Sequence, residues 1–168
     1  MVKEIHRQAF AALDAWVADP AGGLPEEFFL FLSRFMPLVN VDLLIQDDRG
    51  RTLLTWRQDE VYGAGWHVPG GIIRYKETAE DRIRVTARRE LGAEVAFDPE
   101  PVAVEQGIDP DRRERGHFVS LVYRCRLLGS PDPALGYVEG QPQRDQWAWH
   151  EGCPPDLIAW QAAYRKFF

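Results

Sequence analysis

The sequence predicts an α+β fold, in which helices pack on a β-sheet and a helical segment precedes the sheet. Three observations support this class. Short apolar runs typical of strands follow residue 38, one helix with recognisable ends lies in the middle of the chain, and another helix closes the chain. Antiparallel strands that are interrupted by one helix and closed by another favour packed layers around a single core.

The first helix is predicted over residues 3–17. Its apolar side chains recur at the spacing of one helix face, namely Ile5, Ala9, Ala12, Leu13, Trp16 and Val17. A break follows at residues 19–23, which include one proline and two glycines.

A second helix is predicted from Pro25, because proline suits the first turn of a helix. Glu26 and Glu27 lie near its positive end, and an apolar run over residues 28–32 follows. A segment of this length is at the edge of what folds alone. We therefore expect residues 1–35 to form a helical extension that packs on the main domain or on a second subunit.

The main domain is expected to begin with two strands. Apolar runs at residues 38–45 and 52–56 flank the turn sequence 47–50, a pattern that predicts a β-hairpin. Residues 63–65 are expected to be flexible, and residues 66–71 to start extended and end in a turn.

A helix is predicted over residues 78–91. Thr78 and Asp81 have the spacing of a capping box, and Gly92 suits the helix end. Further strands are expected at 94–97, 102–105, 117–128 and 146–150, and a closing helix at 155–166.

The charge balance excludes some classes of partner. The chain has 168 residues, with 26 acidic against 20 basic ones, and a formal net charge of −6. This charge argues against general electrostatic binding to nucleic acid. No run approaches the roughly 20 apolar residues of a membrane span, and the charged N-terminus does not resemble a signal peptide. We expect a cytoplasmic protein that binds neither nucleic acid nor membrane, with Cys125 and Cys153 as free thiols.

Residues 70–92 hold the most informative pattern. Gly71 and Glu77 have five residues between them, and Glu90 and Gly92 end the helix that follows. This spacing resembles the Nudix box, which pairs such a Gly and Glu with a later Arg and a cluster of carboxylates. Three positions depart from the box: Val85 stands for an Arg, and Thr86 and Arg89 each stand for a Glu.

A wider resemblance points to one branch of the family. The GDP-mannose mannosyl hydrolases keep a single metal-binding Glu in the box, and similar segments run from residue 36 to residue 150, at 37–42, 48–50, 53–54, 57, 65–71, 77–80, 90–92 and 143–145. The resemblance implies a Nudix fold, a mixed β-sheet with helices packed on it, over residues 36–168.

The resemblance also implies a metal site. The backbone carbonyl of Gly70, the carboxylate of Glu90 and the side-chain oxygen of Gln143 would bind Mg²⁺, or Mn²⁺ in its place, because hard oxygen ligands suit these ions. Asp42 and Arg57 match positions that contact substrate. The implied reaction is attack by water at the anomeric carbon of a nucleotide sugar, with departure of a nucleoside diphosphate.

The catalytic base is left open. The branch has a histidine directly after the metal-binding Gln, whereas this sequence has Arg144. A guanidinium stays charged near neutrality, so Arg144 and Arg89 suit binding of a diphosphate better than proton transfer. The candidates for the base are Arg144, His67 and Asp145.

Glu90 stands where the negative end of the helix disfavours a carboxylate, so its presence favours a functional role.

Two alternatives and one expectation about assembly remain. The loop 107–116 is either a solvated turn or a lid over the site. Because several box residues are replaced, the alternative function is a catalytically impaired Nudix-fold module that binds a nucleotide or another protein. The apolar residues 28–32 and 167–168 predict a homodimer.

Overall fold

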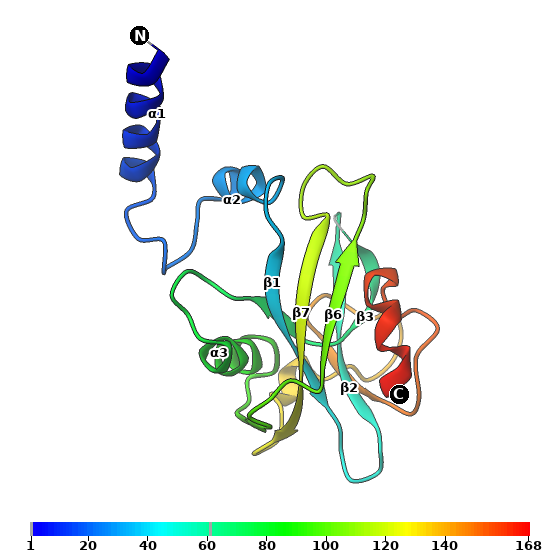
Figure 1. The fold of residues 1–168 in the computed structure, drawn as a ribbon. Helices are drawn as coiled ribbons and strands as arrows, with labels where there is room; N and C mark the ends of the chain where they lie inside the picture. Colours follow the sequence, from blue (N-terminus) through cyan, green and yellow to red (C-terminus); the bar gives the residue numbers. More distant parts are fainter. Residues whose placement is uncertain (1, 61) are drawn as a thin grey trace.

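The computed structural model describes residues 2–60 and 62–168, the side chain of residue 2 excepted. The strands form a five-stranded and a three-stranded sheet, so the predicted α+β class is confirmed (Figure 1). In chain order the elements are α1 (Val2–Trp16), α2 (Glu26–Leu32), β1 (Leu38–Ile45), β2 (Thr52–Asp59), β3 (Gly63–His67), β4 (Gly70–Ile72), α3 (Ala79–Leu91), β5 (Val95–Phe97), β6 (Ala103–Ile108), β7 (His117–Leu127), the 3₁₀ helix η1 (Pro133–Leu135), β8 (Trp147–His150) and the 3₁₀ helix η2 (Ala159–Phe167).

The larger sheet is mixed. Its order is β4-β1-β7-β5. β5 and β6 both pair with the edge of β7 that faces away from β1, β6 along residues 117–122 and β5 along residues 125–127. β1 and β7 are parallel, whereas β4, β5 and β6 pair antiparallel with their neighbours. The smaller sheet has the order β3-β2-β8 and is antiparallel throughout.

The predicted hairpin of residues 38–45 and 52–56 is wrong. Beyond the turn, a single described bridge joins Gln46 to Thr52, and the two strands then enter different sheets. The reason is burial: residues 40–45 of β1 are buried on both faces. A strand of this kind belongs inside a layered structure rather than in a two-stranded hairpin with one face in water.

Two glycine-containing segments are strands rather than the flexible or turn segments that were expected. Residues 63–65 pair with β2, and residues 70–71 pair with β1. Backbone pairing decides both cases although glycine weakens a strand, and the lack of a side chain lets neighbouring groups approach Gly65, Gly70 and Gly71 closely.

Helix α3 covers one face of the larger sheet, and its predicted ends are confirmed. Thr78 Oγ1 accepts a hydrogen bond of 3.1 Å from the backbone N–H of Asp81, and Gly92 ends the helix in the left-handed conformation. The buried face of α3 joins β1 in one core cluster through Ile83, Ala87 and Leu91 on the helix and Val41, Leu43 and Ile45 on the strand.

The end of the chain covers the other face of the larger sheet. It does not form the α-helix that was predicted over residues 155–166. Residues 159–167 form the 3₁₀ helix η2, which is kinked at Gln161. At the kink, the side chain of Gln161 accepts a hydrogen bond of 2.7 Å from the backbone N–H of Val68 and donates one of 3.2 Å to its carbonyl. Phe167 and Phe168 pack against a second core cluster, which includes Leu44, Val122 and Tyr164.

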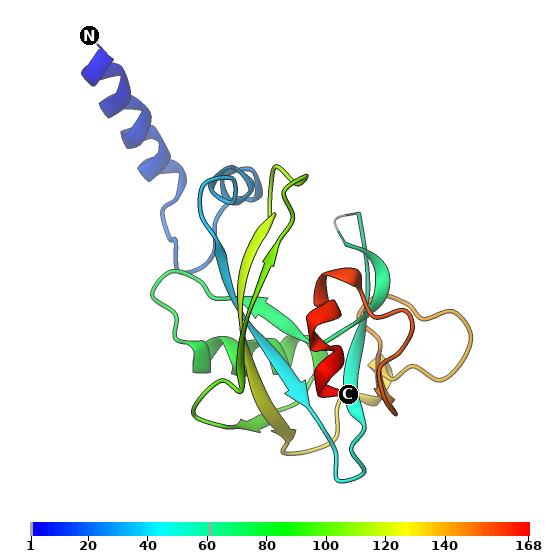
Figure 2. The same ribbon diagram turned by 45° about the vertical axis from the view of Figure 1, so that its right-hand side comes forward.

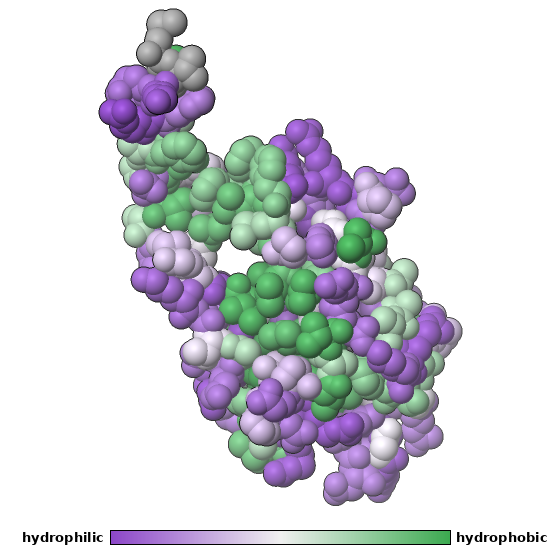
Figure 3. Space-filling view, in the orientation of Figure 1, coloured by the Kyte–Doolittle hydropathy of each residue, from purple (hydrophilic) through white to green (hydrophobic). Residues whose placement is uncertain are grey.

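The two helices of the N-terminal extension differ in their surroundings. Figures 1 and 2 show α1 projecting away from the rest of the molecule, and Phe10 on it is 67% exposed. α2 lies close to the domain, and Figure 3 shows hydrophobic residues gathered there and on the part of the domain that faces it. No helix in the described part of the chain is long and apolar enough to span a membrane.

Candidate active site

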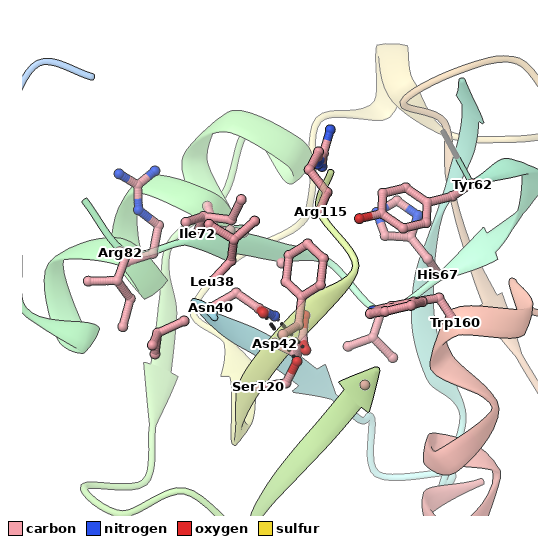
Figure 4. Close-up of a pocket in the computed structure, with 18 of the residues that line it drawn as sticks. Leu38, Asn40, Asp42, Tyr62, His67, Ile72, Arg82, Arg115, Ser120 and Trp160 are labelled. Atoms are coloured by element: carbon pink, nitrogen blue, oxygen red, sulfur yellow. Dashed lines mark hydrogen bonds between the residues drawn. The ribbon is translucent and has the colours of Figure 1, made fainter. Parts of the chain in front are cut away.

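A cavity of about 890 Å³ lies between the sheets and is walled by α2, α3, η2 and the strands β1 to β4 (Figure 4). It gathers most of the residues that the sequence predicts for the site. Seven of these residues line it together with Gly70: Asp42, Arg57, His67, Arg89, Glu90, Arg144 and Asp145. Gln143 is not among the lining residues.

Glu90 stands in the last turn of α3, at the wall of the cavity. Its carboxylate accepts a hydrogen bond of 3.3 Å from Thr55 Oγ1 and lies 3.8 Å from Nε2 of His67. Burial raises the pKa of Glu90 to about 7, an effect that the nearby charge of Arg89 and the Thr55 hydroxyl only partly offset. A carboxylate held in this way lacks a full positive partner and suits a cation.

His67 is fixed beside Glu90 as a neutral imidazole. Its Nδ1 lies 2.8 Å from the backbone oxygen of Thr55. A carbonyl oxygen can only accept, so Nδ1 carries the proton and the lone pair of Nε2 faces Glu90. Burial, with a smaller effect from the charge of Arg57, lowers the pKa of His67 to about 4.

Asp42 belongs to a buried polar network on the floor of the cavity (Figure 4). Its carboxylate accepts hydrogen bonds from Asn40 Nδ2 at 2.9 Å and from the hydroxyl of Tyr164. Ser120 Oγ donates to Asn40 Oδ1 at 3.2 Å and completes the network. Burial raises the pKa of Asp42 to about 6, although these donors favour the charged form.

Gly70 brings the backbone of β4 close to Asp42. The two residues are partners in the β1–β4 register, and a Cβ on Gly70 would overlap Oδ1 of Asp42. Backbone bonds of β4 to β1 involve the carbonyl of Pro69 and the N–H of Ile73. In an antiparallel pair such bonds alternate, so the Gly70 carbonyl turns away from β1. β4 is the outer strand of this sheet, which leaves that oxygen available to a ligand.

The loop before β8 holds the three remaining candidates. Gln143 is exposed, and its backbone bonds Gln146. Arg144 and Asp145 are also exposed but reach the cavity, with Arg144 Nε 3.7 Å from Asp145 Oδ2. The charge of Asp145 adds to the raised pKa of Glu90, so the two carboxylates are electrostatic neighbours.

Sequence reasoning missed several residues that line the cavity. Tyr62, Arg115, Trp160 and Tyr164 come from three separate segments, the last two from η2, and these segments meet only in the folded chain. The one available signal was the loop 107–116, where arginines and carboxylates alternate. Glu77, the glutamate of the box pattern, forms an ion pair with the buried Arg82 at 2.7 Å.

The donor set fits a hard divalent cation in part. No three His, Cys, Asp or Glu side chains among the described residues could hold a metal together. A metal would therefore need the Glu90 carboxylate together with neutral oxygens, of which the Gly70 carbonyl is available at the same cavity. One carboxylate with carbonyl and water oxygens suits Mg²⁺.

The domain matches a known family. Residues 36–167 match the family described as NUDIX domain. The low-salt glycan biosynthesis protein Agl8 of Haloferax volcanii is 34% identical over 111 residues, which are 64% of this chain and 70% of the relative. The ADP-ribose pyrophosphatase of Methanocaldococcus jannaschii is 30% identical over 95 residues, and the match spans 55% of this chain and about half, 53%, of that relative.

Solved structures show the same fold. A protein from Jonesia denitrificans, described as a possible asymmetric diadenosine tetraphosphate hydrolase, superposes with a TM-score of 0.61 at 22% identity and covers 79% of this chain and 92% of its own. A MutT NUDIX hydrolase from Burkholderia pseudomallei gives 0.61 at 24% identity and covers 78% and 97%.

Proposed function

Since the chain belongs to the NUDIX domain family, we propose that it is a Mg²⁺-dependent Nudix hydrolase whose substrate is a nucleoside diphosphate linked to a sugar. One observation carries the proposal: Glu90, the single acidic residue left from the box cluster, is 14% exposed at the cavity wall, and its polar neighbours are a hydroxyl and a neutral imidazole. Nothing in the folding of α3 calls for a carboxylate there, because the negative helix end disfavours it.

Glu90 and the Gly70 carbonyl would hold the metal, and Gln143 is proposed as a third ligand that would approach when the loop moves over the site. When bound, the ion would supply positive charge for the departing diphosphate. Arg57, Arg89 and Arg144 carry further positive charge at the same cavity and suit phosphate oxygens.

The chemistry proposed for these residues is glycosyl transfer to water. The water oxygen bonds to the anomeric carbon, the bond from that carbon to the diphosphate oxygen breaks, and the diphosphate leaves with the electron pair. The proton of the water passes to Asp145 or to Nε2 of His67, because the guanidinium of Arg144 cannot accept it near neutrality.

The names of the relatives support a sugar in the substrate. Agl8 is named for glycan biosynthesis, and the other relative is named for ADP-ribose, in which a diphosphate joins a nucleoside to a sugar. A diphosphate with a group on either side also suits a cavity of about 890 Å³.

A screen of nucleotide sugars in ¹⁸O-labelled water tests the proposal. We expect turnover with Mg²⁺ or Mn²⁺ and none with EDTA, and the label in the free sugar. Label in a phosphate would contradict attack at carbon. Glu90→Gln is expected to abolish turnover, whereas Glu94→Gln, on the exposed carboxylate just past the helix, is the matched control. Turnover no higher than that of Glu90→Gln would refute the proposed activity.

The second candidate is a Nudix-fold binding module without catalysis. It is favoured by the side chains that replace the box, because Thr86 packs against Gly71 and Val85 is partly exposed at the cavity, where the box has an ionic group. Such a module would show a ligand-dependent rise in Tm with no product formed, and metal-dependent turnover lost in Glu90→Gln would exclude it.

A further inference from the structure

The segment that precedes the NUDIX match forms part of the cavity wall. Leu24, Phe29 and Leu32 line the cavity, although the match begins at residue 36. The segment also has a hydrogen bond to the domain, because Arg74 Nη1 donates to the backbone carbonyl of Gly22 at 2.6 Å. The extension is therefore part of the site.

Two contacts join the end of α2 to the loop 107–116. The backbone N–H of Arg115 donates to Ser33 Oγ at 3.0 Å, and Ser33 is buried. The guanidinium of Arg34 forms an ion pair with Glu114, with Nε 2.9 Å from Oε1. Arg115 has a φ of 54°, a conformation that L residues rarely adopt unless their surroundings hold them there.

The guanidinium held in this way has no hydrogen-bond or ion-pair partner among the described residues. Arg115 Nε is buried without a hydrogen-bond acceptor, and no described carboxylate pairs with the guanidinium. The hydroxyl of Tyr62 is likewise buried and unpartnered. Both residues line the cavity, and their side chains lie close to each other there (Figure 4). Buried polar groups usually have a partner, so two unpartnered donors at one cavity point to a ligand with acceptor oxygens.

The charge around Tyr62 indicates the sign of that ligand. Three guanidiniums lie over its ring, with their central carbons 4.4 Å (Arg57), 5.2 Å (Arg115) and 4.7 Å (Arg112) from the centroid. Arg57 pairs with Asp59, whereas no described carboxylate forms an ion pair with Arg112 or Arg115. Two positive charges without carboxylates favour an anion.

We propose that Ser33 and Arg34, outside the NUDIX match, position Arg115 as a substrate-binding residue, and that Arg115 and Tyr62 donate hydrogen bonds to phosphate oxygens of the ligand. The inference rests on the proposed function for the kind of ligand, a nucleoside diphosphate. It adds that the extension determines how well the phosphates are bound. Ser33 and Arg34 are positioning residues, since they act through Arg115.

Binding without metal separates this inference from catalysis. Titration calorimetry in EDTA would compare ADP, GDP, CDP, UDP and inorganic pyrophosphate with the corresponding nucleosides. We expect Arg115→Ala to weaken binding of the phosphate compounds by about 10- to 100-fold, the effect of a lost charged hydrogen bond, and to leave nucleoside binding unchanged. Arg113→Ala, on the exposed neighbour in the same loop, is the matched control and should match the wild type.

The positioning residues have their own readout. Ser33→Ala and Arg34→Ala are expected to weaken diphosphate binding by about 3- to 10-fold, and Ser33→Thr, which keeps the hydroxyl, should restore it. With an identified substrate, these variants should raise KM more than they lower kcat.

Three results would overturn the inference. They are wild-type binding in Arg115→Ala, an equal loss for nucleosides and diphosphates, and no binding of any of these phosphate compounds to the wild type. Absence of turnover with unchanged diphosphate binding would instead refute only the proposed activity.

Discussion

Nε2 of His67 lies 3.8 Å from Oε2 of Glu90, and burial moves the pKa of each group toward its neutral form. An imidazole with a pKa near 4 and a carboxyl with a pKa near 7 share no ion pair at neutral pH. The pair is therefore a place where the folded protein keeps charge low until a cation or a substrate arrives.

The first prediction concerns the pH dependence of stability in EDTA. The pKa of Glu90 is raised from 4.5 to about 7 in the folded state. Its stabilising contribution is therefore complete below pH 4.5 and is lost as the pH rises through 7, by roughly 3 kcal/mol. The pKa of His67 is lowered from 6.5 to about 4, so its contribution has the opposite sign and is lost as the pH falls through that range.

Glu90→Gln separates the two effects. Relative to the wild type, the free energy of unfolding of this variant should rise by roughly 3 kcal/mol between pH 4 and pH 8. Urea unfolding at several pH values measures it, with Glu94→Gln as the exposed control. Parallel curves for the variant and the wild type would show that Glu90 is not perturbed in the folded state.

The second prediction concerns the donor to Asp42. Burial raises the pKa of the Tyr164 hydroxyl, which therefore stays protonated and donates to the carboxylate. Tyr164→Phe should lower the free energy of unfolding by about 1–3 kcal/mol at pH 8, because a buried carboxylate loses a donor. The loss should be smaller at pH 5, below the Asp42 pKa of about 6, since a neutral carboxyl needs fewer donors.

Thermal and urea unfolding at both pH values measure this loss. Tyr75→Phe, on a tyrosine that is 59% exposed, is the control and should leave stability unchanged. An equal loss at pH 5 and pH 8 would indicate that Tyr164 acts through packing alone.

The parts of the fold that depend on neighbouring residues were predictable. Thr78 and Gly92 mark the ends of α3 through contacts within a few residues, so the sequence pattern was sufficient. The partner of β2 was not predictable in this way. The turn at 47–50 lies next to both β1 and β2, but β8, some ninety residues later, supplies the pairing that places β2 in its own sheet.

The residues of the candidate site also fall into two groups, those that the sequence predicted and those that only the folded chain shows. Glu90 was found from the spacing of the box, and Gly70, which directly precedes the box, followed from the resemblance to the family. Tyr62 and Arg115 are 53 positions apart in the sequence and share no motif, so only the folded chain shows that they line one cavity. The position of Gln143 outside the lining residues also depends on the loop conformation, which spacing does not determine.

The third prediction concerns assembly. The homodimer expected from the sequence stays a prediction. Phe167 and Phe168 pack on the core and no longer support it. The exposed apolar residues of α1 support it instead, because Phe10 is 67% and Ile5 is 59% exposed. Light scattering should give the mass of a dimer for the full chain and of a monomer after deletion of residues 1–18. Circular dichroism should show the domain still folded. A full chain that is monomeric at every concentration would contradict the prediction.

The fourth prediction concerns the close approach at Gly70. A Cβ there would overlap the Asp42 carboxylate and lie 3.0 Å from the backbone oxygen of Val41, so neither the side chain nor the strand has room for it. Gly70→Ala should therefore lower the free energy of unfolding by about 1–3 kcal/mol, the cost of overpacking, and should also weaken the response of Tm to Mg²⁺ by displacing the carbonyl. Gly129→Ala, where a Cβ meets nothing within 4 Å, is the control and should be neutral or slightly stabilising. Equal stability of the two variants would mean that β1 and β4 can separate without cost, and the Gly70 carbonyl would then be too poorly fixed to serve as a metal ligand.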